Sequence, residues 1–270
     1  MPILRFLFIT LLFTTSLNAA PKADLWSLWQ IHADEVTFTV DYSGWKQFLD
    51  KHLRVDESSI NLVDYENVTQ ADKSALAKVL SGLQQVKVSR LTREQQKAFW
   101  INLYNAGTVK VIVDHYPVDS ILDIDISPGW LSNGPWGKKL FNIEDAAVSL
   151  DDIEHRILRP IWRDPRIHYV LNCASIGCPD LQPAPFTPEN MEDRLDQAAR
   201  GFISHPRGVT LVNGKLTVSS IYIWFKKDFG NTDKNLIDHL IHYAGKDLEE
   251  RLHKVKDVSD HAYDWSINKL

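Results

Sequence analysis

Residues 92–117 read TREQQKAFWINLYNAGTVKVIVDHYP, the longest helical pattern in the chain. Thr92 and Gln95 form the sequence signature of a capping box, in which each side chain bonds the other residue's backbone N–H. Pro117 cannot continue a helix, because it lacks the backbone N–H and its ring clashes with the preceding turn. The sequence therefore predicts one long helix that ends near His115.

Two asparagines, Asn102 and Asn105, lie on an otherwise apolar stripe of this helix. An unpaired buried amide costs about 1–3 kcal/mol, so both side chains need hydrogen-bond partners. Two roles are open. The amides bond the backbone of an irregular loop, such as residues 118–148, or they orient a catalytic side chain or a ligand. We predict that both are buried and bonded, and we include both among the candidate site residues.

Helical and extended patterns alternate without a regular rhythm on either side of the long helix. Helical spacing of apolar residues predicts helices at 45–53, 69–83, 149–158, 187–202 and 236–244, with Ser149 as a cap and Pro160 as a stop. Residues 167–173 form a strand pattern, and Asn213-Gly214 predicts a hairpin over 209–218. Breakers fill residues 118–148, which we expect to be loop. The fold class is therefore α+β: helices packed on a small, mostly antiparallel sheet.

The N-terminus has the three parts of a secretory signal peptide. Arg5 precedes an apolar run at residues 6–13, and small residues follow at 14–20. The run is too short to span a bilayer, which needs about 20 apolar residues, although an uncleaved anchor is the alternative. We expect residues 1–20 to be removed and residues 21–270 to form a single globular domain that is periplasmic or secreted.

The charge balance of the expected mature chain is acidic. Removing one arginine from 30 Lys plus Arg leaves 29 against 35 Asp plus Glu, a net charge of −6. Nucleic-acid binders are usually basic, so we expect no nucleic-acid partner and, after signal cleavage, no membrane partner. No cofactor motif is present, so we expect no cofactor. A small molecule or a peptide is left as the substrate class, with its identity open.

The chain has two cysteines, Cys173 and Cys178, within the segment RIHYVLNCASIGCP at residues 166–179. On a regular strand, Cys173 would face away from His168, whereas Cys178 lies beyond Gly177 in a loop. A thiol beside a histidine can ionise at neutral pH and act as a nucleophile. This makes Cys178 the candidate nucleophile and His168 a candidate base. The alternatives are a disulfide between the two cysteines or, for Cys173, a buried apolar role.

A second histidine, His155, follows Glu154 in the helix predicted at 149–158. Adjacent helical residues do not face each other, so the pair is either a solvated helix face or part of the same cleft as His168. The histidines and cysteines are also zinc-type ligands, but their spacing matches no zinc-binding pattern. The candidate catalytic residues are therefore Cys178, His168, His155, Asn102, Asn105 and Glu154, with no metal ligand assigned.

Several of these segments together resemble the domain of unknown function 547 family. The matching motifs are FWINLYNA at 99–106, SLDDIEH at 149–155, DPRIHY at 164–169, CASIGCP at 173–179 and YIWFKKDF at 222–229. The resemblance covers about residues 85–230. It points to the residues rather than to a reaction, because the family name carries no activity. Some relatives are fused to glutaredoxin-like modules, which implies thiol chemistry by association only.

A weaker comparison is with papain-like and transglutaminase-like enzymes, which also combine a polar-faced helix with a later histidine-bearing strand. Their nucleophilic cysteine precedes the histidine, whereas both cysteines here follow His168. Our leading hypothesis is a thiol-dependent hydrolase or acyltransferase acting on an amide or ester. The alternatives are a non-catalytic ligand-binding or structural domain and a redox-active dithiol or zinc-binding protein.

Overall fold

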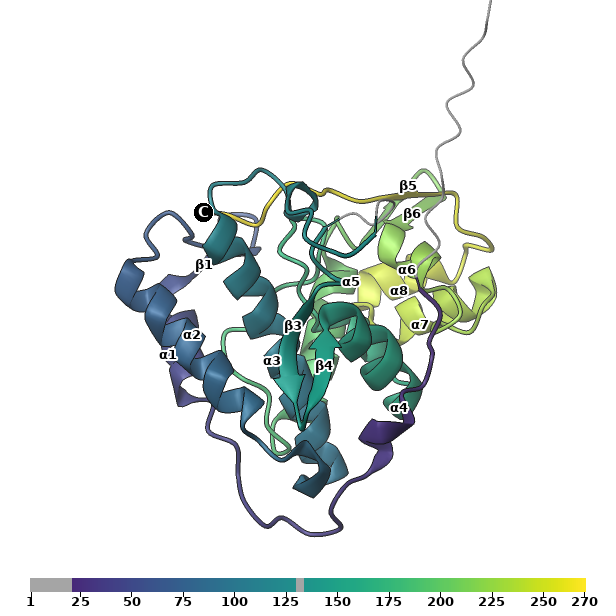
Figure 1. Ribbon diagram of the computed structural model, residues 1–270. Helices are drawn as coiled ribbons and strands as arrows, with labels where there is room; N and C mark the ends of the chain where they lie inside the picture. The colour runs from purple at the N-terminus through teal and green to yellow at the C-terminus, as the bar shows by residue number, and fades with distance from the viewer. Residues whose placement is uncertain (1–20, 130–133) are drawn as a thin grey trace, which may run out of the picture.

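The computed structural model describes residues 21–129 and 134–270, and the expected signal peptide at 1–20 lies outside the described residues. The fold is α+β, as predicted (Figure 1). The α-helices are α1 (Ser43–His52), α2 (Gln70–Gln84), α3 (Arg93–His115), α4 (Arg159–Trp162), α5 (Met191–Ser204), α6 (Ser220–Trp224), α7 (Asp233–Tyr243) and α8 (Lys246–Leu252). Short 3-10 helices lie at Ser27–Gln30, Val88–Arg90, Ile121–Asp123 and Pro165–Tyr169, and a π-helix at Asp152–Leu158.

The strands form three small sheets rather than the single one expected. β1 (Leu53–Val55) pairs antiparallel with β2 (Asn61–Val63), and β3 (Lys139–Ile143) pairs antiparallel with β4 (Ala146–Ser149). The third sheet has the order β5 (Val209–Val212), β6 (Lys215–Ser219), β7 (Asp260–Ala262), with β5–β6 antiparallel and β6–β7 parallel. The predicted hairpin at 209–218 is thus confirmed.

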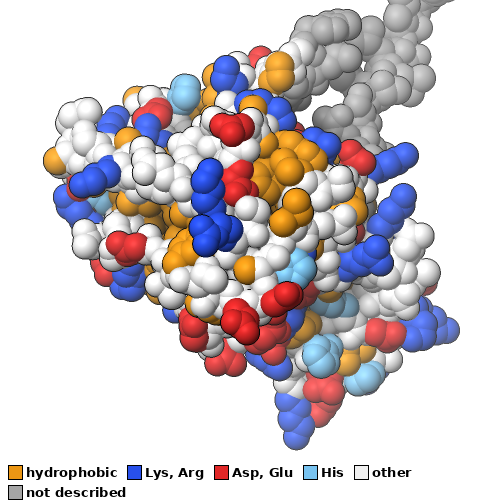
Figure 2. Space-filling model, turned by 60° about the horizontal axis from the view of Figure 1, so that its bottom comes forward, with side chains coloured by type: hydrophobic (Ala, Val, Ile, Leu, Met, Phe, Trp, Pro, Cys, Tyr) orange, Lys and Arg blue, Asp and Glu red, His pale blue; other side chains and the backbone are white. Residues whose placement is uncertain are grey.

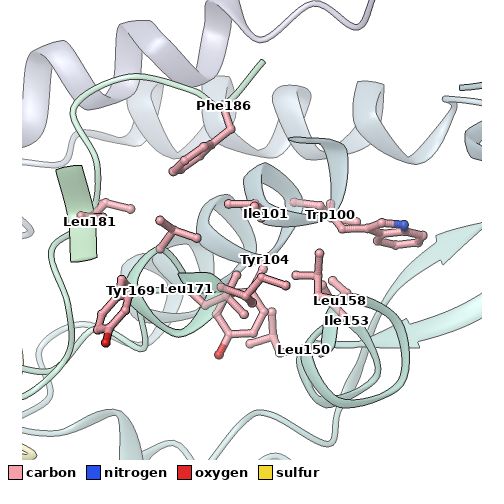
Figure 3. Close-up of a cluster of buried hydrophobic side chains, with 14 of the residues drawn as sticks. Trp100, Ile101, Tyr104, Leu150, Ile153, Leu158, Tyr169, Leu171, Leu181 and Phe186 are labelled. Carbon is pink, nitrogen blue, oxygen red and sulfur yellow. The ribbon is translucent and has the colours of Figure 1, made fainter. Parts of the chain in front are cut away.

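Helix α3 is the central element, and the other elements surround it (Figure 1). Its capping box is present: the Thr92 side chain accepts from the Gln95 backbone, and the Gln95 side chain accepts from the Thr92 backbone. The helix is buried on all sides over most of its length, not on one stripe only. Trp100, Ile101 and Tyr104 pack against side chains of the π-helix and of the loop before α5 (Figure 3).

Two local predictions were wrong. Residues 118–148 are not all loop, because β3 and β4 form a hairpin there whose turn residues Glu144 and Asp145 have φ of 47° and 68°. Residues 167–173 are not a strand: a 3-10 helix spans Pro165–Tyr169, with Pro165 in its first turn and the Asp164 side chain accepting from Arg166 N–H. The apolar run is buried on all sides, and the strand pattern reflected that burial rather than sheet pairing.

The helix predicted at 149–158 exists and is capped by Ser149, but Pro160 does not stop it. Proline has no backbone N–H. Inside a helix, the carbonyl four residues before a proline therefore lacks its usual hydrogen-bond partner. Here that carbonyl belongs to Arg156 and accepts instead from Trp26 N–H at 2.9 Å. The His155 carbonyl likewise accepts from Asp24 N–H. The N-terminal arm therefore covers the helix where the proline opens it.

The C-terminal segment crosses the molecule as an extended strap, here called the C-terminal strap and defined as residues 260–268. It begins with β7, and its backbone bonds Ala174, Ile176 and Gly177 on one side. Farther along, Asn268 accepts from Val63 N–H, which ties the strap to β2. The strap thus fixes the cysteine loop to elements from the opposite end of the sequence.

The surface in Figure 2 mixes Lys, Arg, Asp and Glu side chains with small hydrophobic areas, and no broad area of one charge is visible on that face. Among residues 21–129 and 134–270, no helix has both the length and the apolar character needed to cross a bilayer.

Candidate functional site

The two cysteines lie in contact in the loop between the 3-10 helix at Pro165–Tyr169 and α5. Both are free thiols, and their Sγ atoms are 2.8 Å apart. A disulfide bond is about 2.05 Å long, so forming one would move the sulfurs together by less than about 1 Å. Cys173 is partly exposed, whereas Cys178 is only 3% exposed. The pair therefore has one accessible thiol and one buried thiol.

Hydroxyl groups surround the sulfur of Cys173. The Tyr263 hydroxyl lies 2.9 Å from Cys173 Sγ and 2.8 Å from Ser175 Oγ. Ser175 Oγ in turn lies 3.4 Å from Cys173 Sγ. Cys178 has a different partner, because the backbone N–H of Cys173 donates to Cys178 Sγ at 2.9 Å.

These contacts separate the pKa values of the two thiols. Burial raises the pKa of Cys173, but hydrogen bonds from Cys178, Ser175 and Tyr263 outweigh burial and lower it. Burial raises the pKa of Cys178 well above its usual value, and the adjacent sulfur of Cys173 raises it further. A low thiol pKa marks the attacking thiol, because the thiolate is the nucleophile.

The loop that carries the thiols is held by side-chain clips. The Asn172 amide donates to the Pro179 carbonyl and accepts from Ala174 N–H, which closes the loop on itself. Arg207 donates to the carbonyls of Ile176 and Cys178 from outside the loop. Ala174 has a φ of 57°, in the left-handed region that side chains rarely adopt. The surrounding bonds maintain this conformation.

A second cluster, here called the charged network, consists of Glu154, His155, Arg159, His168 and Asp228. His168 lies between two carboxylates: its Nε2 is 2.8 Å from Asp228 Oδ2, and its Nδ1 is 3.6 Å from Glu154 Oε1. Arg159 donates from Nε to the same Asp228 oxygen at 2.6 Å. Two cations thus share one carboxylate in the interior.

The network shifts the pKa values of its two histidines in opposite directions. Burial lowers the pKa of His168, but the bonds to Asp228 and Glu154 outweigh it, so the pKa is raised. His155 Nδ1 accepts from Arg159 at 3.0 Å, which leaves its proton on Nε2. Burial and the Arg159 charge lower the pKa of His155, with Glu154 opposing. The surroundings therefore favour the charged form of His168 and the neutral form of His155.

The carboxylates of this region also differ in their pKa values. Burial raises the pKa of Glu154, but the histidines and the guanidinium around it lower it to about 2. Asp151 lies 3.6 Å from His155 Nε2 and is 43% exposed at its side chain. Burial and the neighbouring carboxylates raise its pKa to about 6. The pKa of Asp151, which lies beside the network, is therefore closer to neutral pH than that of Glu154.

An aromatic ring covers the charged network. Phe225 stacks on His168 with ring centroids 4.1 Å apart, and the Arg159 guanidinium lies 4.7 Å from the centroid of the Phe225 ring. Cations over aromatic faces are stabilised by the ring quadrupole, most strongly when water is excluded. The ring therefore stabilises both cations and covers part of the network.

Asn102 and Asn105 are buried and bonded, as predicted, and each amide makes a two-bond clip to backbone. Asn102 donates to the Phe186 carbonyl and accepts from Phe186 N–H. Asn105 donates to the Val170 carbonyl and accepts from Asn172 N–H. The loop they bond is not 118–148 but the two segments on either side of the cysteine loop. Both amides attach the thiol-bearing segment to α3.

The structure brings together three of the candidate residues, Glu154, His155 and His168, within the charged network. Cys178 is apart from them: in the parts of the chain that the structure describes, neither sulfur forms a hydrogen bond with a histidine. The charges still reach each other, because the Glu154 carboxylate opposes the lowering of the Cys173 pKa. Residues 167–173 do not form a strand, so the expectation that Cys173 faces away from His168, which assumed a regular strand, has no basis.

Sequence reasoning missed Asp228, Arg159 and Tyr263. Asp228 was visible as the acid in the YIWFKKDF motif, and Arg159 lies four residues after His155 on the same helix. Tyr263 had no local signal, since it is 90 residues from Cys173. Within residues 21–129 and 134–270, no group of three or more His, Cys, Asp or Glu side chains is arranged to hold a metal ion.

The arrangement defines a class: an α+β domain with a dithiol loop clipped to a central helix. Residues 88–203 match the family described as "Protein of unknown function, DUF547", so the chain contains a domain of this family. The matched region holds both cysteines and most of the charged network, while Asp228 and Tyr263 lie beyond it. No curated protein and no solved structure matches the chain.

Proposed function

We propose that the protein is a redox-active dithiol protein that carries out thiol–disulfide exchange at Cys173 and Cys178. One observation carries this proposal: two free thiols in contact at 2.8 Å, of which Cys173 is partly exposed and Cys178 is buried. Exchange needs an accessible thiolate to attack and a second thiol in reach to complete the reaction. The lowered pKa of Cys173 and the raised pKa of Cys178 suit these two roles.

The reaction has two steps. The Cys173 thiolate attacks one sulfur of a substrate disulfide, a bond forms between the two, and the other substrate sulfur leaves as a thiolate that takes a proton from solvent. Cys178 then gives its proton to solvent and attacks Cys173 Sγ. The bond between Cys173 and the substrate breaks, and the second substrate sulfur leaves as a thiolate that takes a proton from solvent. The protein dithiol is oxidised to a disulfide by two electrons, and the substrate disulfide is reduced to two thiols. The reverse sequence oxidises a substrate dithiol.

A thiol-dependent hydrolase or acyltransferase is the second candidate. Asp151 favours it, because a half-exposed carboxyl with a pKa of about 6 suits proton transfer near neutral pH. It has less support than exchange, because such an enzyme needs a base at its nucleophile, and no histidine of the described chain bonds either thiol. Cys178, the nucleophile expected from sequence, is also the less accessible sulfur.

We also propose that this chemistry takes place outside the cytoplasm, where disulfides persist. The support is the signal-peptide pattern of residues 1–20. Sequencing the N-terminus of the periplasmic or secreted protein should give a start near Pro21. An intact Met1 on protein recovered from the cytosol would contradict the proposal.

A trapping experiment tests the exchange. Reduced wild-type protein, Cys178→Ser and Cys173→Ser are incubated with hydroxyethyl disulfide, and intact masses are measured. Wild type should lose two mass units without keeping an adduct. Cys178→Ser should keep one mercaptoethanol adduct on Cys173, because its resolving thiol is missing. Cys173→Ser, the matched control, should stay largely unmodified.

Two results would overturn exchange. Wild type that retains two thiols under these conditions is not a redox-active dithiol, and inert thiols in both variants would favour the binding or structural domain. An adduct found on Cys178 rather than Cys173 would reverse the assigned roles. Ester or amide hydrolysis that is lost in Cys178→Ser, without an oxidised form of the wild type, would favour the hydrolase.

A further inference from the structure

The Tyr263 hydroxyl is the nearest oxygen donor to the accessible thiol. It lies 2.9 Å from Cys173 Sγ, and Ser175 Oγ lies 2.8 Å from the same hydroxyl. A tyrosine hydroxyl is a donor to a thiolate as long as it keeps its own proton. Burial raises the pKa of Tyr263 well above its usual value, with the adjacent thiols adding to it. The group is therefore a proton-bearing donor at neutral pH.

The position of this hydroxyl is fixed by its surroundings. The Tyr263 ring packs on Trp224 and Trp265, with ring centroids 4.9 and 4.6 Å away. Gly177 N–H donates to the Asp264 carbonyl at 2.8 Å, next to the tyrosine. A Cβ on Gly177 would lie 2.7 Å from Asp264 N, so the close approach of strap and loop requires glycine here.

Among the described residues, the hydrogen-bond donors to Cys173 Sγ do not include a cationic side chain. Arg207, the guanidinium at this loop, donates to the carbonyls of Ile176 and Cys178 and pairs with Asp180 at 2.6 Å. Throughout residues 21–129 and 134–270, no Lys, Arg or His side chain forms a hydrogen bond with Cys173 Sγ.

The remaining charges near the thiols act against ionisation. The Glu154 carboxylate disfavours the Cys173 thiolate, and the buried Tyr104 hydroxyl donates to Glu154 at 3.4 Å rather than to a sulfur. A partly buried thiolate without a neighbouring cation depends on the hydrogen bonds it accepts. The side-chain donors available to Cys173 are Tyr263, Ser175 and the Cys178 thiol.

We propose that Tyr263, supported by Ser175, is a catalytic residue of the thiol site, which holds Cys173 as a thiolate by donating a hydrogen bond to Sγ. The role rests on the proposed function only in that the thiolate is the attacking group. Ionisation of Cys173 itself requires no disulfide substrate. The C-terminal strap is accordingly part of the reactive site and not only a structural closure.

The test is the pH dependence of iodoacetamide alkylation at Cys173, read by peptide mapping in wild type, Tyr263→Phe and Ser175→Ala. Loss of a hydrogen bond to a charged group should raise the alkylation midpoint of Tyr263→Phe by about one pH unit or more. Ser175→Ala should shift it upward by less, because its contact to sulfur is longer at 3.4 Å. Tyr243→Phe is the matched control, since that hydroxyl bonds no other described group, and its midpoint should stay at the wild-type value.

Circular dichroism of each variant checks that the fold is retained. An unchanged midpoint in folded Tyr263→Phe overturns the proposal, and if that variant does not fold, an unchanged midpoint in Ser175→Ala does so. The trapping experiment separates this result from the proposed function. Exchange with no shift in midpoint removes only the role of Tyr263. A clear shift in a protein that fails to exchange leaves Tyr263 as the thiolate donor and removes the redox function.

Discussion

The charged network and the thiol pair satisfy their polar groups in different ways. In the network, His168 and Arg159 are both bonded to Asp228, and Phe225 covers them. In the thiol pair, Cys173 is partly exposed, and within the described residues its sulfur bonds only the neutral side chains of Ser175, Cys178 and Tyr263. Paired charges that are closed to water make a rigid scaffold, whereas an exposed thiol with adjustable donors can react. Under the proposed function, the histidines that looked catalytic in sequence support the site, and the thiols are its reactive part.

Removing Asp228 should have the largest effect and should break the network without disturbing the thiols. Asp228→Ala leaves His168 and Arg159 buried without their shared carboxylate, which should lower the free energy of unfolding by about 3–5 kcal/mol. Urea unfolding measures it. Asp238→Ala is the control: Asp238 and Lys234 form an exposed pair, so the change should be within about 0.5 kcal/mol. A cost below about 1 kcal/mol in Asp228→Ala would show that the network is not a scaffold.

The amide clips of α3 connect the helix to the thiol segment and come next in size. Asn105→Leu leaves the Val170 carbonyl and Asn172 N–H without partners, which should cost about 1–3 kcal/mol. Thermal and urea unfolding measure the loss. Asn142→Leu, at an exposed position of β3, is the control and should change stability by less than about 0.5 kcal/mol. Wild-type stability in Asn105→Leu would mean that the clip is dispensable.

Gly177→Ala tests the contact between the C-terminal strap and the cysteine loop. The new Cβ would meet the Asp264 backbone at 2.7 Å, so the strap must move away from the cysteine loop, at a cost of about 1–3 kcal/mol. The alkylation midpoint of Cys173 should rise together with the loss of stability, because Tyr263 moves with the strap. Gly201→Ala is the control: nothing lies within 4 Å of its added Cβ inside α5, and helix propensity should make it slightly stabilising. An unchanged midpoint in Gly177→Ala would separate the strap from the thiol.

The smallest expected effect is in the pH dependence of stability. His168 faces Asp228, Glu154 and Arg159, and its pKa is raised in the folded state. Its stabilising contribution is therefore complete below the ordinary histidine pKa and is lost as the pH rises through the folded value. The stability difference between wild type and His168→Gln should shrink from pH 6 to pH 9. His155, whose pKa is lowered, should show the opposite trend in His155→Asn. A parallel trend in the two variants would contradict the assigned charges.

Local signals predicted the elements that depend on local contacts. The capping box of Thr92, the hairpin at 209–218 and the burial of both asparagines were all readable, because each follows from neighbours in sequence or from the cost of burying an amide. The strand predicted at 167–173 was wrong, because an apolar run that is buried on all sides looks like a strand in sequence without forming one. Pro160 misled for a similar reason: its missing hydrogen bond is replaced by the N-terminal arm, which no local pattern shows.

The site was less predictable than the fold. Glu154, His155 and His168 were named as candidates because they are titratable and close in sequence, and the structure places them in one cluster. Their assignment as partners of a thiol followed from residue type alone, and residue type does not record which carboxylate a histidine faces. Tyr263 joins the site through tertiary contacts of the strap, and contacts between distant segments leave no periodicity that a single sequence reveals.

The strap also determines when the site is completed. A growing chain emerges N-terminus first, so Cys178 is made 85 residues before Tyr263 (263 − 178 = 85). At synthesis rates of about 5–20 residues per second, the completed thiol pair waits roughly 4 to 17 seconds for the Tyr263 hydroxyl. During this interval the cysteine loop lacks the backbone partners that Asp264 and Ser266 later provide. The nascent chain therefore carries a Cys173 thiol that gains its Tyr263 hydrogen bond only when the C-terminal strap docks, so a nascent chain that ends before the strap should carry a less acidic Cys173.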